Sequence, residues 1–150
     1  MCFWGLLGNQ HVKILLDSGS HTFISSVITL GCPTMQQLPL PLQVQVANGQ
    51  VLTCSSHIPN ASWSIQDCQF SSDLKVLPLS SYDMILGLDW LEAHSPMAVH
   101  WGQKWIQLQH QGTTVQLVGI WPDLTARAIL QLCSLDPQQS IDPPAYHVEV

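Results

Sequence analysis

Basic residues are scarce in this 150-residue chain. Lys and Arg number 4 against 10 Asp and Glu, which gives a formal net charge of −6. Proteins that bind nucleic acid usually present a basic face, so no nucleic-acid partner is expected. Charged residues make up only 9% of the chain, and hydrophobic residues make up 46%. Because disordered segments are polar and highly charged, we expect a folded domain with a substantial core.

Long apolar runs are also missing. The first eight residues are apolar, but they lack a basic leader and are too short to span a bilayer. No membrane partner is therefore expected. The five cysteines are irregularly spaced and include no Cys-x-x-Cys pair, which suits a reducing compartment better than a disulfide framework. We expect the protein to be intracellular, in the cytoplasm.

No cofactor or metal site is expected either. The seven histidines show no His-Glu-x-x-His spacing, so the common zinc-hydrolase motif is absent. Cys54, His57 and Cys68 are conceivable metal ligands. We interpret them instead as small buried thiols and an exposed imidazole.

Short apolar runs separated by Gly, Pro, Asn and Ser are typical of β-strands. Residues 42–46 alternate apolar and polar side chains, so we expect a strand with one buried face. Asn48-Gly49 then favours a two-residue hairpin turn with positive φ at both positions. One short helix is predicted at residues 88–93. The other predicted strands are residues 3–7, 12–16, 22–30, 50–53, 63–65, 68–70, 74–77, 83–87, 98–101, 105–108 and 115–118.

The composition changes after Gly119. Residues 122–133 have a helical pattern, and residues 136–144 are rich in Pro, Gln and Asp, which is typical of a linker. We therefore predict a domain at residues 1–119 and a C-terminal helix and linker tail at residues 120–150.

The strongest functional signal is Asp17. It follows an apolar run and precedes Ser18 and Gly19, the arrangement in which an aspartic protease holds its catalytic aspartate. Amide hydrolysis by such a site needs two close carboxyls, one ionised as the base and one protonated as the acid. No other aspartate in the chain is followed by Ser-Gly or Thr-Gly. A catalytic Asp17 would therefore require the second carboxyl from another copy of the chain. The alternative is that Asp17 lies in an ordinary polar turn.

Two further elements stand in the order that this interpretation needs. Ile85, Leu86 and Gly87 form an apolar pair followed by glycine, the element that packs against the aspartate loop in aspartic proteases. Between it and Asp17 lies the Asn48-Gly49 hairpin, where a flap over the substrate would belong. A plain surface hairpin is the alternative for that segment.

Together these motifs resemble the retropepsin-like aspartic protease domain of Ty3/Gypsy-class retrotransposon polyproteins, of the plant type. The matching stretches are LDSGSHTFIS at 16–25, VQVANG at 44–49 and YDMILGLDWL at 82–91, with a weaker match at 99–106. The resemblance covers about residues 5–119. It implies an all-β fold, half of a closed barrel with one short helix after the Ile-Leu-Gly strand, and obligate dimerisation.

The resemblance also implies roles for individual residues. Asp17 would be the catalytic carboxylate. Asp83 and Asp89 flank the Ile85–Gly87 element, and we interpret both as hydrogen-bonding or surface carboxylates. The loop around Asp17 would be supported by Ser18, Gly19, Ser20, Ile85, Leu86 and Gly87. The flap would consist of Val46, Ala47, Asn48, Gly49 and Gln50.

Two functions follow. The first is an aspartic endopeptidase that acts as a homodimer on a polypeptide substrate, the polyprotein of the retrotransposon. The second is a catalytically silent dimerisation or peptide-binding module left from a retroelement. The intact Asp-Ser-Gly favours the first. Because no zinc knuckle or polymerase accompanies the domain, we expect an isolated reading frame.

Overall fold

The computed structural model describes residues 1–29, 32–46 and 48–121. Apart from one helix, α1 (Leu88–Ala93), the regular elements of this part of the chain are strands. The strands are β1 (Cys2–Leu7), β2 (Gln10–Leu16), β3 (Phe23–Ser25), β4 (Gln36–Gln45), β5 (Val51–Ile65), β6 (Cys68–Leu77), β7 (Met84–Leu86), β8 (Met97–His100), β9 (Trp105–His110) and β10 (Thr113–Val118). The all-β fold class and the short helix are both confirmed.

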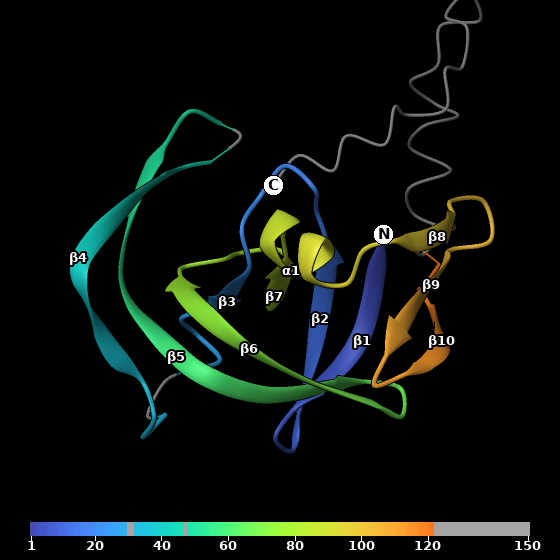
Figure 1. Ribbon diagram of the computed structural model, residues 1–150. Coiled ribbons are helices and arrows are strands. Elements are labelled where there is room, and N and C mark those ends of the chain that lie inside the picture. Colours follow the sequence, from blue (N-terminus) through green and yellow to red (C-terminus); the bar gives the residue numbers. More distant parts are fainter. Residues whose placement is uncertain (30–31, 47, 122–150) are drawn as a thin grey trace, which may run out of the picture.

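Six strands close into a barrel, shown in the centre of Figure 1. Their order is β1-β2-β7-β3-β6-β5, and β5 pairs back with β1, which closes the sheet. The closure is tight at Gly5, where an added Cβ would lie 2.6 Å from the carbonyl oxygen of Ser64. Glycine is the residue that allows two backbones to approach this closely. The seventh strand, β4, pairs only with β5 among the described residues.

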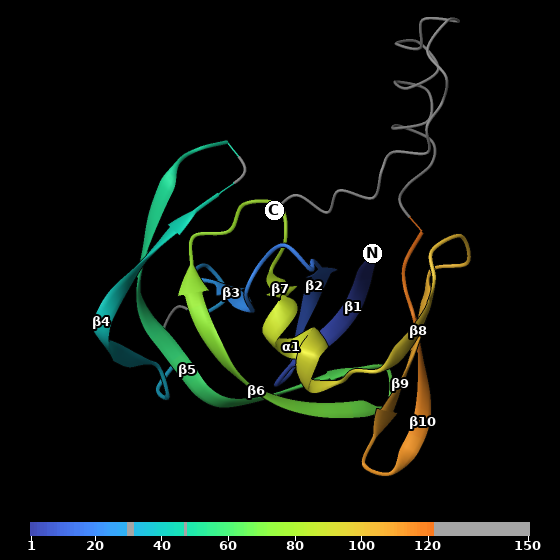
Figure 2. The same ribbon diagram turned by 45° about the horizontal axis from the view of Figure 1, so that its top comes forward.

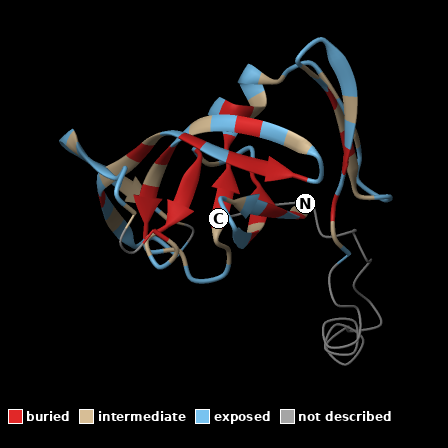
Figure 3. Ribbon diagram, turned by 90° about the horizontal axis from the view of Figure 1, so that it is seen from below, coloured by how far each residue is buried: buried red, intermediate tan, exposed pale blue. Residues whose placement is uncertain are grey.

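The barrel interior is filled by large apolar side chains, and Figure 3 shows the buried residues concentrated in its strands. Trp63 stacks on Phe70 with ring centroids 4.7 Å apart, and Trp90 of α1 meets Phe70 edge-on at 5.6 Å. Such aromatic pairs favour stacked and edge-on geometries. Trp90 therefore anchors α1 against the barrel.

A small antiparallel sheet of order β10-β9-β8 lies beside the barrel, at the right of Figure 1. Ile106, Leu108 and Leu117 of this sheet are buried in the same core as the barrel residues. After β10 the chain returns to β1, where the Ile120 amide donates to the Cys2 carbonyl over 2.8 Å. The sheet is thus part of one continuous core.

Several predictions of strand extent are wrong, and the strand predicted from residue 42 begins at Gln36. The strand predicted at residues 22–30 ends at Ser25, because the chain turns there and the Ile28 amide bonds to the Ser25 carbonyl. The runs at 50–53 and 63–65 belong to the single strand β5, and those at 68–70 and 74–77 to β6. Antiparallel pairing between β5 and β6 continues through the polar residues, with one register shift between Ile58 and Ala61.

The buried face predicted for residues 42–46 is only partly formed. Leu42 is 41% exposed and Val44 is half-buried. The reason is that β4 is the last strand of the sheet, so little of the molecule covers it. Alternation correctly indicated a strand with two different faces, but it carries no information about what lies over either face.

The predicted helix at 122–133 and the linker at 136–144 fall outside the described residues. Among the residues that are described, no helix has the length and apolar character needed to cross a bilayer.

Candidate active site

Asp17 lies at the end of β2 and is completely buried. Its amide donates to the Leu86 carbonyl over 2.9 Å, and its carboxylate Oδ1 accepts the Gly19 amide over 2.8 Å. The Ser20 amide also reaches the Asp17 carbonyl, at 3.3 Å. These bonds hold both the backbone and the carboxylate in one orientation. Ser18 and Gly19 are exposed and Ser20 is half-buried, so the loop reaches the surface directly beside a buried acid.

The predicted supporting element, Ile85 to Gly87, lies against this loop. Strand β7 runs parallel to β2, with Leu16 opposite Leu86, and antiparallel to β3, with Phe23 opposite Ile85. It therefore passes between the strand that enters the Asp17 loop and the strand that leaves it. Ile85 and Leu86 are each 1% exposed. These buried pairings hold the backbone on both sides of the loop.

The two elements approach each other closely at Gly87. A Cβ at this position would overlap the Ser20 carbonyl oxygen and the backbone of His21. The next amide, that of Leu88, donates to the same Ser20 carbonyl over 2.7 Å. Gly87 therefore lets the start of α1 make direct backbone contact with the Asp17 loop.

Thr22 joins the two elements through its side chain, a role that the sequence interpretation missed. Its hydroxyl donates to Asp89 Oδ1 over 2.8 Å and accepts the Gly87 amide over 3.1 Å. Thr22 is only 2% exposed. The available signal was a hydroxyl residue next to the apolar pair Phe23-Ile24, but the sequence does not say which polar residues become buried.

The predicted flap lies at the tip of the β4–β5 hairpin. The Val46 amide donates to the Gln50 carbonyl, and the Gly49 amide donates to the Val46 carbonyl, both over 2.9 Å. The turn is therefore closed between Val46 and Gly49, and Gly49 follows with φ of +83°. The two-residue turn predicted at Asn48-Gly49 is wrong, because the turn closes at Gly49 and the glycine lies after it rather than inside it. Ala47 is outside the described residues.

The hairpin tip and the Asp17 loop lie on the same side of the molecule in both Figure 1 and Figure 2. An apolar cluster connects the hairpin to the strand that follows the loop. Its buried members are Phe23, Cys54 and Leu77, and Val44 and Leu52 of the hairpin pack against them. The arrangement places the hairpin and the oriented carboxylate on one face of the molecule.

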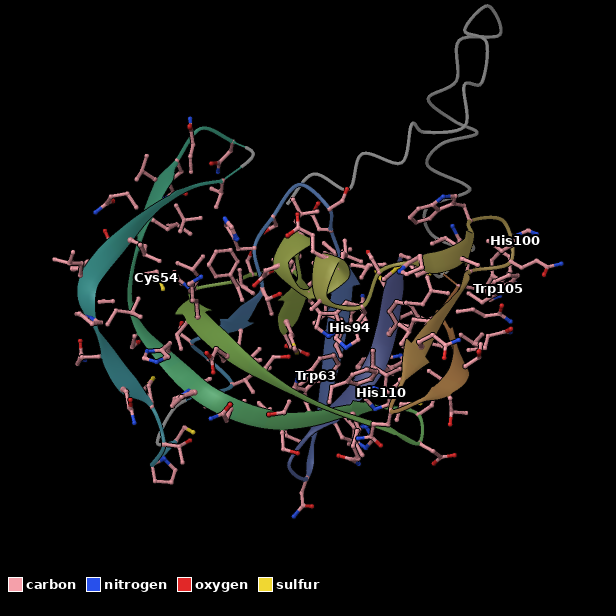
Figure 4. All side chains as sticks on the ribbon, viewed as in Figure 1. Cys54, Trp63, His94, His100, Trp105 and His110 are labelled. Atoms are coloured by element: carbon pink, nitrogen blue, oxygen red, sulfur yellow. The ribbon has the colours of Figure 1, made fainter. Side chains whose placement is uncertain are left out.

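The conceivable metal ligands have other surroundings. Cys54 is buried in the cluster under the hairpin, at the left of Figure 4, and Cys68 is half-buried. His57 is half-buried, whereas an exposed ring was expected. Within the described part of the chain, no group of three His, Cys, Asp or Glu side chains is arranged to hold a metal ion.

Several other aromatic and histidine side chains pack against one another. Figure 4 shows Trp63, His94 and His110 grouped near α1, where His94 stacks on Trp90 at 4.3 Å and His110 lies over Phe70 at 4.5 Å. These rings belong to the junction of the barrel and the small sheet.

The comparisons with known proteins agree with this geometry. The family model described as retroviral aspartyl protease matches residues 5–113. Among solved structures, the retroviral protease-like domain of Ddi1 from Leishmania major is similar, with a TM-score of 0.63 at 12% identity, over 82% of this chain and 95% of that one. At this identity the likeness shows a common retropepsin-like fold.

A protein of unknown function from Legionella pneumophila also matches, with a TM-score of 0.39 at 11% identity, over 61% of this chain and 84% of that one. No curated protein sequence matches the chain. Because the family model spans most of the chain, including the Asp17 loop and the Ile85–Gly87 element, this protein belongs to the retroviral aspartyl protease family.

Proposed function

We propose that this protein is an aspartic endopeptidase that hydrolyses peptide bonds as a homodimer, with one Asp17 from each protomer. The observation that carries the proposal is the buried Asp17, whose carboxylate is oriented by the Gly19 amide at the surface of the molecule. Burial of a carboxylate costs free energy, and an ordinary surface turn would avoid that cost by leaving Asp17 exposed. Membership of the family supports the same chemistry.

In the proposed reaction the two Asp17 carboxyls share one proton, because two like charges at such short range do not both ionise. The ionised carboxylate takes a proton from a water molecule, which attacks the carbonyl carbon of the substrate. The protonated carboxyl donates its proton to the carbonyl oxygen. Collapse of the tetrahedral intermediate then passes a proton to the leaving amine and restores the shared proton.

The proposed dimer follows from the single catalytic aspartate in each chain. The Asp-Ser-Gly triplet occurs once in the chain, and the reaction needs two carboxyls in contact. The exposed Ser18 and Gly19 support close approach of a second loop, because neither carries a bulky side chain. The site is incomplete in a single protomer.

The proposed substrate is the polyprotein of a Ty3/Gypsy-class retrotransposon of the plant type, processed in the cytoplasm. The three matching stretches around Asp17, Asn48 and Gly87 support this origin, and the irregular cysteine spacing supports the compartment. The β4–β5 hairpin would close over an extended peptide.

The test is Asp17→Asn, with Asp67→Asn as the matched control. Asp67 is an exposed aspartate in the turn between β5 and β6. Purified chains are incubated with an apolar model peptide, and the products are measured by mass spectrometry alongside sedimentation of the protein. We expect Asp17→Asn to abolish cleavage and to leave a folded dimer, and Asp67→Asn to cleave normally. Equal cleavage by both variants contradicts the proposal. If the wild-type protein binds the peptide but cleaves it at no pH, the result supports the catalytically silent module.

A further inference from the structure

A second aspartate, Asp83, is built into the framework of the Asp17 loop. It directly precedes β7 and is half-buried. Its carboxylate Oδ2 accepts the Lys13 amide over 2.8 Å, and its own amide donates to the Lys13 carbonyl over 3.0 Å. One residue therefore satisfies both backbone groups of Lys13 in β2.

Asp83 also holds the strand on the other side of β7. Its carbonyl accepts the Ser25 amide at the end of β3, over 2.7 Å. The Lys13 side chain is held next to this point, since its ammonium lies 5.5 Å from the centre of the Tyr82 ring. The start of β7 is thus tied to β2 and β3 together.

The other end of β7 holds the catalytic candidate. Three residues after Asp83, the Leu86 carbonyl accepts the Asp17 amide over 2.9 Å. A strand of three residues has few ladder bonds of its own, and a slip of one residue would move every side chain to the opposite face. The bonds of Asp83 oppose such a slip at the end of β7 away from Asp17.

We propose that Asp83 is a positioning residue for Asp17, which sets the register of β7 against β2 through the Lys13 backbone and so fixes the Leu86 carbonyl that holds the Asp17 amide. The catalytic part of this inference rests on the proposed function. Asp83 takes no part in the proposed chemistry, since it lies at the end of β7 away from Asp17 and its carboxylate bonds to the Lys13 backbone. Asp83 acts only by fixing the position of Asp17. A displacement of a catalytic group by about 1 Å can lower turnover about 100-fold.

The test compares Asp83→Ala, Asp83→Asn and the control Asp73→Ala. Asp73 also accepts a backbone amide of another strand, that of Asn60 over 2.8 Å, but it lies in the β5–β6 ladder. Asp83→Asn retains an oxygen that can accept the Lys13 amide. Hydrogen exchange of the Asp17 amide is measured by NMR relative to the amides of β9 in the small sheet. We expect this ratio to rise about 10-fold in Asp83→Ala and to stay near wild type in the other two variants.

Peptide cleavage is measured on the same proteins under conditions where each is folded. For Asp83→Ala we expect kcat to fall about 10- to 100-fold with KM changed less than about threefold, and Asp83→Asn to recover most of the rate. A merely structural role would lower the amount of folded protein without this kcat effect. An unchanged exchange ratio or an unchanged kcat in Asp83→Ala overturns the inference. If the wild-type protein cleaves nothing, the proposed function fails, and the exchange ratio still decides whether Asp83 positions Asp17.

Discussion

Replacement of Thr22 by valine tests how the Asp17 loop is joined to α1. Valine has nearly the same shape as threonine, so packing is retained and only the hydroxyl is lost. That hydroxyl accepts the Gly87 amide and donates to Asp89. Both Thr22 and Gly87 are buried, so water does not replace the lost oxygen at the Gly87 amide.

The expected cost is dominated by that amide. A buried donor left without an acceptor costs about 1–3 kcal/mol, and we expect Thr22→Val to lower the free energy of unfolding by about 2 kcal/mol. Asp89 is exposed and can be rehydrated, so Asp89→Asn should cost less than about 1 kcal/mol. Thr22→Ser keeps the hydroxyl and loses one methyl group, which is worth about 0.8 kcal/mol.

The assay is urea unfolding at equal protomer concentration, because the stability of the proposed dimer would depend on concentration. Thr53→Val is the matched control, since the Thr53 hydroxyl bonds to Gln43 at an exposed position. We expect its effect to be within about 0.5 kcal/mol of zero. The reasoning is refuted if Thr22→Val is as stable as Thr53→Val, or if Asp89→Asn costs more than Thr22→Val.

Two further predictions concern the same loop. Gly87→Ala should lower the free energy of unfolding by about 3 kcal/mol or prevent folding, because its Cβ would overlap the backbone of Ser20 and His21. Thermal unfolding checks this against Gly102→Ala, whose Cβ would meet only the His100 side chain, at 3.3 Å; equal melting temperatures would contradict it. Peptide cleavage should be fastest at acidic pH and decline as pH rises, because in the proposed mechanism the two Asp17 carboxyls must keep one shared proton. A rate that climbs steadily to pH 9 would exclude a shared-proton mechanism.

Local patterns predicted much of the molecule. The apolar run before Asp17, the helix at 88–93 and the strands of the small sheet were all visible as short-range signals. Strand alternation and turn residues reflect the chain's own backbone preferences, so these elements keep their type in the folded protein. Their lengths were less certain, as β5 shows, because polar residues within a paired strand resemble a break.

The links around Asp17 depended on contacts far apart in the sequence. Lys13 and Asp83 are 70 residues apart, and Thr22 and Asp89 are 67 apart. Nothing near Thr22 in the sequence distinguishes it from an exposed threonine. Only the passage of β7 between β2 and β3 buries it and gives its hydroxyl two partners.

By itself, the sequence determined which acid is the catalytic candidate and that the chain forms short strands with one helix, since these depend on neighbouring residues. The tertiary structure decided that β5 closes on β1, that β4 stays exposed, and that Asp83 and Thr22 brace the loop from opposite ends of β7. The physical reason is that a strand's backbone groups can bond to any other strand, and the choice among partners is made by the packing of the whole barrel.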